Sequence, residues 1–482
     1  MTVHDPEAWR SKPQAQDVDY PEPEKLHKVL KEIETFPGLV STTEIDRLSA
    51  QMANVADGKA FLLQSGDCAE LFSYCNPAQI EAKLKLTLLM SLIIVHGVRL
   101  PVVRVGRIAG QYGKPRSKPT EVVDMGGEKC TVLSFRGDNV NGLDIADRAP
   151  DPERLLSAYF RSAATLNYIR SWLSSGNADL HAPQSWSFHH VQSEYLQCEF
   201  GRITREIADA LDFMKTVGAT PGDGETPANA LNTVDYFISH ECLMLEYEDA
   251  LSHRTSQGLY DLSAHTVWLG DRTRQVDGAH VAFVRSIRNP IGIKVGPSMD
   301  AEELIRILDA VNPAMVKGRV TLITRYGAGN IKDMLPQHIR AVQSSRHSGL
   351  VVWCCDPMHG NTITSKYNSS IKTRMFSDIV KELAAALQIH AQLENRLGGV
   401  HLELTGDNGV TECIGGSMEL SDQDLSRNYL SYCDPRLNYE QSLDIAFLIS
   451  EVLRSQRTGK GLESDAIVRA LSQYMDVNLP SP

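Results

Sequence analysis

The residues best suited to hold anions are six cationic side chains that end or follow apolar runs of the sequence. They are Arg107, Lys114, Arg116, Arg272, Lys294 and Arg325. Six positive charges brought together would repel one another unless anions lay between them, and arginine offers carboxylates and phosphates a bidentate partner. The stretch KPRS at 114–117 adds the hydroxyl of Ser117 and a proline-stiffened turn. Together they predict a site for two phosphate or carboxylate groups, although any one of them alone is more often an ordinary surface charge.

A second group of residues has the chemistry of a metal site. It consists of Cys68, His359, Glu403 and Asp434. A thiolate, an imidazole and two carboxylates form a mixed soft and hard donor set, which suits Mn²⁺, Fe²⁺, Co²⁺ or Zn²⁺. No short ligand spacing such as CxxC or HExxH supports the grouping. A buried thiol at Cys68 and an arginine-paired carboxylate at Glu403 therefore stay open as alternatives.

Strand-like apolar runs alternate with helix-period stretches along most of the chain. Seven such runs lie at 60–68, 100–110, 265–272, 291–296, 320–327, 350–360 and 399–406, and a weaker eighth lies at 178–183. Helical patterns between them include 154–173 and 300–311, the second opened by Asp300 and Glu303 in capping-box spacing. The alternation predicts eight βα units and hence a (β/α)₈ TIM barrel. Functional residues of that fold lie at the carboxyl ends of the strands, which is where most of the candidate residues stand.

Two segments are not needed to close such a barrel. Residues 1–40 are rich in proline and charge, with an amphipathic candidate helix at 24–36, and we expect them to form an N-terminal extension that makes subunit or regulatory contacts. Residues 41–482 are expected to form a single catalytic barrel. An extra helical insertion is expected around 190–255, in which 218–232 has the composition of an exposed loop.

Bulk composition argues against several classes of protein. The net charge of −12 disfavours nucleic acid and anionic membranes as partners. The nine cysteines are scattered, and the N-terminus lacks an apolar signal core, which indicates reduced thiols and a cytoplasmic protein. The longest apolar stretch, at 86–98, is too short to cross a bilayer.

Six longer motifs stand in order between about Trp9 and about Arg454. They are AFLLQSGDCAE, RIAGQYGKPRS, WLGDRTRQVDGAH, CDPMHGNT, HLELTGDNGVTEC and CDPRLN. Together they resemble the type II family of 3-deoxy-D-arabino-heptulosonate 7-phosphate (DAHP) synthases. The resemblance implies a TIM-barrel transferase that condenses phosphoenolpyruvate with D-erythrose 4-phosphate to DAHP and phosphate, the first step of the shikimate pathway to aromatic amino acids. Two positions depart from the family, which often has Glu in place of Asp271 and usually Gly in place of Ser65.

The resemblance also implies a role for each candidate residue. Cys68, His359, Glu403 and Asp434 would bind one divalent ion, Mn²⁺ in the first place and Co²⁺, Fe²⁺ or Zn²⁺ as alternatives. Phosphoenolpyruvate would be held by Arg107, Lys114, Asp271, Arg272, Lys294 and Arg325. Erythrose 4-phosphate would be held by Lys114, Arg116 and Ser117. The candidates for a direct part in catalysis are Lys114, Cys68 and His359, and we expect Lys114 to deliver a proton to the aldehyde oxygen.

Three other functions remain open on the sequence alone. One is a related metal-dependent enzyme, 3-deoxy-octulosonate 8-phosphate synthase, which takes arabinose 5-phosphate. Another is a Schiff-base aldolase that uses Lys294, and the third is a catalytically silent scaffold. Further expectations are a homo-oligomer (dimer or tetramer) and an aromatic amino acid as feedback effector. Asp356 is expected either to orient the imidazole of His359 or to cap a helix.

Overall fold

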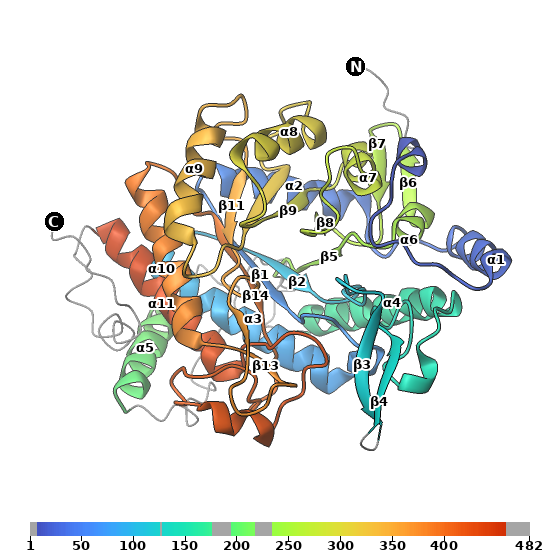
Figure 1. Cartoon of the computed structure of the whole chain (residues 1–482). Coiled ribbons are helices and arrows are strands. Elements are labelled where there is room, and N and C mark those ends of the chain that lie inside the picture. The colour runs from blue at the N-terminus through green and yellow to red at the C-terminus, as the bar shows by residue number, and fades with distance from the viewer. Residues whose placement is uncertain (1–6, 126–127, 176–193, 217–233, 459–482) are drawn as a thin grey trace.

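The structure is a computed structural model that describes residues 7–125, 128–175, 194–216 and 234–458. Eight parallel strands close into a barrel in the order β1-β14-β11-β10-β9-β8-β5-β2 (Figure 1). Their bounds are β1 (Phe61–Gly66), β2 (Val102–Arg107), β5 (Phe237–Glu241), β8 (Thr266–Leu269), β9 (Ile291–Val295), β10 (Val320–Thr324), β11 (Val352–Cys355) and β14 (Gly399–Glu403). The predicted (β/α)₈ TIM barrel is confirmed.

The barrel strands are buried on both faces. Every residue of β1, β9, β10 and β14 is buried, which is the pattern of a parallel sheet covered by helices. The pairing of β1 with β14 sets Leu62 opposite Gly399 and Gly66 opposite Glu403. A Cβ atom on Gly399 would lie 2.4 Å from the carbonyl oxygen of Leu62, so the close approach of the two strands requires glycine there. This register fixes the relative height of the side chains at the carboxyl ends of the two strands.

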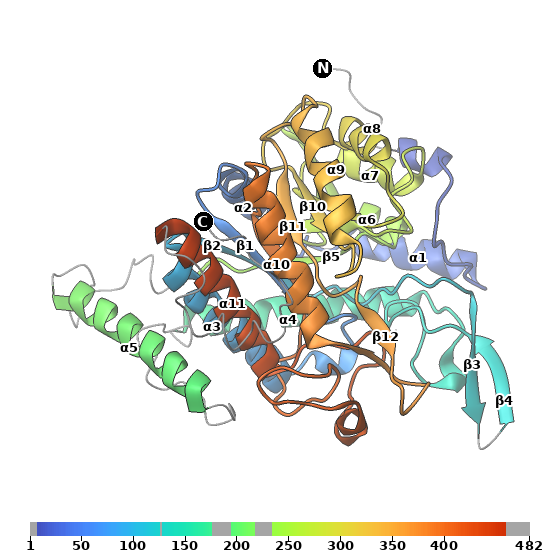
Figure 2. The same cartoon turned by 60° about the vertical axis from the view of Figure 1, so that its left-hand side comes forward.

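Helices cover the outside of the barrel (Figures 1 and 2). Their bounds are α2 (Thr42–Ala56), α3 (Pro77–Val98), α4 (Glu153–Ser174), α6 (Leu245–Ala250), α7 (Ala279–Ser286), α8 (Ala301–Val311), α9 (Ile331–Gln343), α10 (Phe376–Gln392) and α11 (Tyr439–Thr458). The carboxylate of Asp300 accepts a hydrogen bond of 2.7 Å from the backbone N–H of Glu303, which confirms the predicted start of α8. The apolar stretch 86–98 lies in α3, where most of its side chains are buried in the core. Among the described residues, no helix combines the length and apolarity needed to span a membrane.

The apolar core has two parts. Inside the barrel, Leu48 and Met52 of α2 form one cluster with Leu62, Val103 and Phe237. These strand residues stand at or next to the first positions of their strands, so α2 closes the amino end of the barrel. The larger cluster packs the outer faces of the strands against the surrounding helices.

The seven stronger strand predictions are confirmed, and the eighth strand lies elsewhere in the chain. The predicted strand at 178–183 falls outside the described residues, as does the predicted loop at 218–232. The barrel is closed instead by β5, which pairs with β2 and with β8. This strand lies inside the range 190–255 that we expected to be a helical insertion, together with α5 (Glu194–Thr216) and α6. Its five residues, FISHE, carry too few apolar side chains to stand out in the sequence.

The segments between the barrel strands and the helices contain three two-stranded antiparallel sheets and several short 3₁₀ helices. The antiparallel pairs are β3 (Thr120–Met125) with β4 (Glu128–Leu133), β6 (Ser252–Thr255) with β7 (Gly258–Asp261), and β12 (Thr362–Thr364) with β13 (Lys372–Arg374). The short 3₁₀ helices are η1 (Ala8–Ser11), η2 (Phe72–Tyr74), η3 (Ile145–Asp147) and η5 (Asp422–Arg427). Figure 2 shows β3 and β4 projecting from the body of the barrel.

The described part of the N-terminal extension packs against the barrel of its own chain. Trp9 in η1 is buried and meets the ring of Phe283 in α7 edge-on, with 6.2 Å between the ring centroids. Helix α1 (Pro23–Ile33) packs against α4 and α6. The side-chain oxygen of Gln16 accepts a hydrogen bond of 2.7 Å from the backbone N–H of Arg116. The extension therefore reaches the loop that carries the KPRS stretch, while its expected subunit and regulatory contacts stay predictions.

Candidate active site

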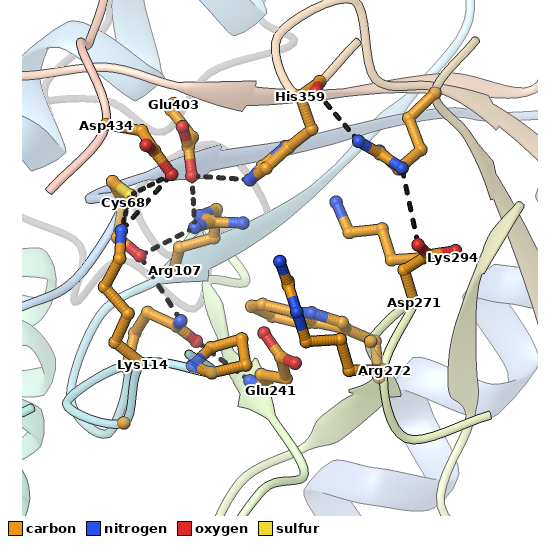
Figure 3. Close-up of a pocket in the computed structure, with 16 residues that line it drawn as sticks. Cys68, Arg107, Lys114, Glu241, Asp271, Arg272, Lys294, His359, Glu403 and Asp434 are labelled. Atoms are coloured by element: carbon orange, nitrogen blue, oxygen red, sulfur yellow. Dashed lines mark hydrogen bonds and ion pairs between the residues drawn. The ribbon is translucent and has the colours of Figure 1, made fainter. Parts of the chain in front are cut away.

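A pocket lies at the carboxyl ends of the strands, and all eight strands supply part of its wall (Figure 3). The contributors are Cys68 after β1, Arg107 at the end of β2, Glu241 at the end of β5, Asp271 and Arg272 after β8, Lys294 in β9, Arg325 after β10, His359 after β11 and Glu403 at the end of β14. Lys114 and Asp434 enter from the loops that follow β2 and β14. The structure thus brings together all of the predicted site residues except Arg116 and Ser117.

The four candidate metal ligands lie in this pocket as two close pairs. The Sγ atom of Cys68 is 3.8 Å from Oδ2 of Asp434, and Nε2 of His359 is 2.9 Å from Oε1 of Glu403. Among the residues that the structure describes, no three His, Cys, Asp or Glu side chains are drawn together closely enough to hold an ion. The donor types nevertheless fit a divalent transition ion, because one thiol, one imidazole and two carboxylates share a single pocket (Figure 3).

Cations lie directly against three of these four side chains, those of Cys68, Asp434 and Glu403. The Nζ atom of Lys114 is 3.2 Å from Oδ2 of Asp434 and 3.7 Å from Sγ of Cys68. Glu403 is held between Arg107 and Arg374, at 3.0 and 2.9 Å from its two carboxylate oxygens. The positive charges of these residues balance the negative charges of the two carboxylates. Without such partners, a buried carboxylate would be strongly destabilising.

The charge state of the two acids follows from this balance. Burial by itself raises the pKa of Glu403, but the charges of His359 and Arg374 more than offset it and hold the pKa well below its ordinary value. Burial likewise raises the pKa of Asp434, and the ammonium group of Lys114 makes the largest opposing contribution, so the net shift is downward. Both carboxylates are therefore ionised at neutral pH, which is the form that binds a cation.

Asp356 fixes the imidazole of His359. Its Oδ2 atom is 2.7 Å from Nδ1 of His359, and its Oδ1 atom accepts backbone N–H bonds from Met358 and His359. Lys294 forms an ion pair with the same carboxylate. The contact to Nδ1 leaves Nε2 facing the pocket, as in metal-ligating histidines. The orienting interaction predicted for Asp356 is therefore present, and no helix begins there for it to cap.

The indole of Trp268 forms an apolar surface beneath two of the buried cations. The guanidinium carbon of Arg107 is 5.0 Å from the ring centroid, and Nζ of Lys294 is 6.0 Å from it. Arg107 is further fixed by donating hydrogen bonds to the carbonyl oxygens of Asp67, at 2.8 Å, and Cys68, at 3.0 Å. Burial lowers the pKa of Lys294, and Asp356 opposes that shift. The two cations are thus preorganised at the bottom of the pocket.

Asp271 pairs with two arginines and a serine in another part of the pocket wall. Its Oδ1 atom accepts from Arg274, at 3.2 Å, and from the hydroxyl of Ser298, at 3.1 Å, while Oδ2 lies 3.8 Å from Nη1 of Arg325. Arg325 also donates to the carbonyl oxygen of His359 at 2.9 Å. The shorter acid at this position therefore still reaches the cations around it.

Arg116 and Ser117 lie outside the pocket wall. The guanidinium group of Arg116 is paired with Glu121 of β3, which also accepts from Arg148 at 2.5 Å. Ser117 is exposed. The predicted contact of both residues with a sugar phosphate stays a prediction.

The pocket contains a carboxylic acid that the sequence reasoning missed. Glu241 is partly buried, and its Oε1 atom is inaccessible to solvent and has no hydrogen-bond partner among the described residues. Burial raises its pKa, against the opposing charges of Lys294 and Arg107. A Cβ atom on Gly270 would lie 2.0 Å from Oε1, so glycine at this position makes room for the carboxylate. The only signal in the sequence was an acid at the end of a strand, and that strand, β5, was itself unrecognised.

Comparison with known proteins decides the family. A family model described as the class-II DAHP synthetase family matches residues 4–450. The chain belongs to this family. It is 48% identical over 474 residues to a phospho-2-dehydro-3-deoxyheptonate aldolase of Neurospora crassa, covering 95% of this chain and 96% of the relative. It is 46% identical over 453 residues to a protein of the same name from Streptomyces coelicolor, covering 93% and 97% of the two chains.

A solved structure of a phospho-2-dehydro-3-deoxyheptonate aldolase from Francisella tularensis SCHU S4 is a weaker match. It shares 15% sequence identity and a TM-score of 0.42, over 92% of this chain and 98% of that one, and at that level the likeness carries no argument. Family membership confirms the resemblance drawn from the motifs and makes the chain an enzyme, a 3-deoxy-7-phosphoheptulonate synthase. The scaffold alternative is thereby removed. DAHP synthases are generally metal-dependent.

Proposed function

We propose that this enzyme condenses phosphoenolpyruvate with erythrose 4-phosphate in the pocket at the carboxyl end of the barrel. The observation that carries the proposal is the joint presence of many cations and a metal-donor set in one pocket. The cations are Arg107, Lys114, Arg272, Lys294 and Arg325. Phosphoenolpyruvate carries a phosphate and a carboxylate, and a second phosphorylated substrate adds further negative charge. Such a pocket holds two mutually repelling anions at reacting distance.

The metal would be held by Cys68, His359, Glu403 and Asp434, and Mn²⁺ is our first choice of ion. When bound, such an ion supplies Lewis-acid polarisation of the aldehyde. The protein's own contribution to this part of the pocket is the fixed orientation of His359 by Asp356 and the ionised state of Glu403 and Asp434.

Each bond change in the reaction requires a contribution from a nearby side chain. C3 of phosphoenolpyruvate forms a bond to the aldehyde carbon, and the aldehyde oxygen takes up a proton. Lys114 stands beside the candidate metal ligands and carries protons on an ammonium group, so we assign it the delivery of this proton. Arg107 and Lys294, held over Trp268, bind the phosphoenolpyruvate anion and stabilise the phosphate as it departs.

A water molecule must add to C2 and lose a proton before the bond from C2 to the phosphate oxygen breaks. Glu241 is the acid whose position suits the acceptance of that proton. Its Oε1 atom faces no protein donor among the described residues, and Lys294 and Arg107 lie in its electrostatic surroundings. The hydroxyl left on C2 passes its proton to the departing phosphate as the bond from C2 to the phosphate oxygen breaks, and C2 becomes the ketone of DAHP. The proton taken up by Glu241 then replaces, through solvent, the one that Lys114 gave to the aldehyde oxygen.

The substrate pair is tested by measuring phosphate release from phosphoenolpyruvate with erythrose 4-phosphate or with arabinose 5-phosphate as the second substrate. We expect release only with erythrose 4-phosphate. Phosphate release with arabinose 5-phosphate but not with erythrose 4-phosphate, each in the presence of phosphoenolpyruvate, would favour the octulosonate phosphate synthase. Covalent trapping of substrate on Lys294 by borohydride would favour the Schiff-base aldolase and overturn the anion-binding role of that lysine.

A further inference from the structure

Two loops of the candidate active site are joined to each other directly. The loop after β10 carries Arg325, and the loop after β11 carries His359. A Cβ atom on Gly360 would lie 2.2 Å from the backbone nitrogen of Gly327, so the two backbones are in contact there. Arg325 adds a hydrogen bond of 2.9 Å to the carbonyl oxygen of His359. A cation of the pocket and a candidate metal ligand therefore stand on one connected piece of structure.

A buried acid on α10 accepts hydrogen bonds from both loops. Helix α10 packs against α9 outside the barrel (Figure 2), and its residue Glu382 is fully buried. The Oε1 atom of Glu382 accepts from the backbone N–H groups of Tyr326 and Gly327, at 2.8 and 2.9 Å. Its Oε2 atom accepts from Nδ2 of Asn361 at 2.7 Å. One carboxyl group thus holds the first loop through Oε1 and the second loop through Oε2.

Asn361 continues this link into the turn that carries His359. Its Nδ2 atom also donates to the carbonyl oxygen of Pro357 at 2.8 Å, and its Oδ1 atom accepts from the backbone N–H of Ala328 at 2.9 Å. The bond from Ala328 fixes the orientation of the amide, because a flipped amide would set its NH₂ group against that N–H. Asn361 must therefore present a donor, and only a donor, to Glu382.

The role of Glu382 as an acceptor does not depend on its charge. Burial raises its pKa to about 8, and the N–H bond from Gly327 opposes that rise. A carboxyl group keeps acceptor capacity in either protonation state. An apolar side chain in its place would leave the buried N–H groups of Tyr326 and Gly327 unmet, and each unmet donor would favour a rearranged loop.

We propose that Glu382 is a positioning residue that fixes Arg325 and His359 relative to each other. Glu382 lies outside the lining of the pocket, so it acts only through the two loops. The inference rests on the proposed function, in which Arg325 binds phosphoenolpyruvate and His359 binds the metal. It adds a division of labour: the affinity for phosphoenolpyruvate depends on the bonds to Oε1, and the affinity for the metal depends on the bond to Oε2.

The variants Glu382→Gln and Glu382→Leu separate the two oxygens. Glutamine has one acceptor oxygen, which will face the two backbone N–H groups, because the opposite orientation sets its NH₂ group against both of them. Its NH₂ group then meets Nδ2 of Asn361. We expect Mn²⁺ affinity to fall about tenfold in Glu382→Gln, with phosphoenolpyruvate affinity within about twofold of the unmodified chain. In Glu382→Leu, both affinities should fall about tenfold or more.

Both affinities are measured by isothermal titration calorimetry of the full chain. Titration of the metal-free chain with Mn²⁺ gives the first, and titration with phosphoenolpyruvate at saturating Mn²⁺ gives the second. The matched control is Ile379→Ala, one turn earlier on α10 and equally buried. This variant should lose stability but keep both affinities, because it removes packing without touching the bonds to the loops. A purely structural role would make the Glu382 variants behave like this control.

Two results would overturn the inference alone. They are unchanged Mn²⁺ affinity in Glu382→Gln, and an equal loss of both affinities in that variant, with normal binding by the unmodified chain in each case. Glu382→Gln decides the question even if Glu382→Leu does not fold. Failure of the unmodified chain to bind phosphoenolpyruvate or Mn²⁺ would overturn the proposed function, and this inference with it.

Discussion

The two ends of the barrel share their strands but differ in chemistry. At the carboxyl end, β1 and β14 lead to Cys68 and Glu403, which lie among ionised side chains. At the amino end, the same strands begin beside an apolar cluster that α2 closes. The side chain of His390, buried near that end, is neutral because burial lowers its pKa to about 3. Buried ions are tolerated only where opposite charges or a bound ligand compensate for the loss of hydration. The barrel therefore concentrates buried charge at the end where substrates and a metal would bring the missing counter-charges.

The carboxyl end shows this compensation acid by acid. Glu403 is paired with Arg107 and Arg374, and Asp434 is paired with Lys114 and Lys372. This difference between the two ends leads to a prediction. Substitutions at the carboxyl end should change turnover and the binding of substrate or metal, whereas substitutions in the apolar cluster at the amino end should change the free energy of unfolding.

The largest effect is expected from His359→Ala. The substitution removes one of the four donors, and loss of the metal's polarisation corresponds to about 4 kcal/mol, or about a thousandfold in turnover. The measurement combines steady-state phosphate release with metal content after dialysis. His253→Ala, on the exposed strand β6, is the control and should change neither. Normal metal content and normal turnover in His359→Ala would remove His359 from the ligand set.

The next largest effect is expected from Lys114→Met. The methionine keeps much of the side-chain volume but cannot donate a proton, so turnover should fall about a hundredfold or more. Metal content should be retained, because Lys114 is not one of the four donors. The exposed Lys118 in the same loop provides the control, Lys118→Met. Turnover within about twofold of the unmodified enzyme would refute the proton-delivery role.

A smaller effect is expected from Asp356→Asn. The amide keeps the shape of the side chain but weakens its interaction with Nδ1 of His359, and such outer partners typically change metal affinity or activity by about tenfold to a hundredfold. Titration of the metal-free variant with Mn²⁺ measures the affinity. Asp300→Asn, which makes the same chemical change at the exposed start of α8, should leave the affinity unaltered. An unchanged Mn²⁺ affinity in Asp356→Asn would contradict the orienting role.

The smallest effect on catalysis is expected from Leu48→Ala at the amino end. Leu48 is fully buried in the cluster that closes the barrel, so the free energy of unfolding should fall by about 2–5 kcal/mol. Turnover per folded molecule should not change. Denaturant unfolding and activity at low temperature measure the two quantities, with the half-exposed Val316→Ala as a control that stays within about 0.5 kcal/mol. A large loss of turnover in the folded variant would break the division between the two ends.

The sequence predicted most of the barrel because its strands are buried on both faces and therefore read as apolar runs. Seven strands and the start of α8 were found in this way. Strand β5 was not, because Ser239 and His240 interrupt its five residues and its place is set by pairing with β2 and β8. Closure of the barrel depends on contacts between strands that are distant in the sequence, so a local pattern of apolar residues does not predict it.

The candidate site was predictable to a similar extent and for a related reason. Residues at the ends of recognised strands were selected correctly as members of one pocket, whereas Glu241 was missed together with its strand. The ion pair of Lys294 with Asp356 joins side chains from β9 and the loop after β11, which are not neighbours in the barrel order. Such pairings depend on side-chain reach across the pocket, so the sequence gives no sign of them. The sequence also gives no sign that Arg116 forms an ion pair with Glu121.

The central claim, a metal-dependent condensation at the carboxyl end of the barrel, is tested most directly by one assay. Consumption of phosphoenolpyruvate in the presence of erythrose 4-phosphate is followed by ultraviolet absorbance before EDTA, after EDTA, and after Mn²⁺ is restored. We predict that EDTA abolishes consumption and that Mn²⁺ returns it. Consumption that EDTA leaves unchanged would contradict the metal role of Cys68, His359, Glu403 and Asp434 and would make Lys294 the first candidate for catalysis.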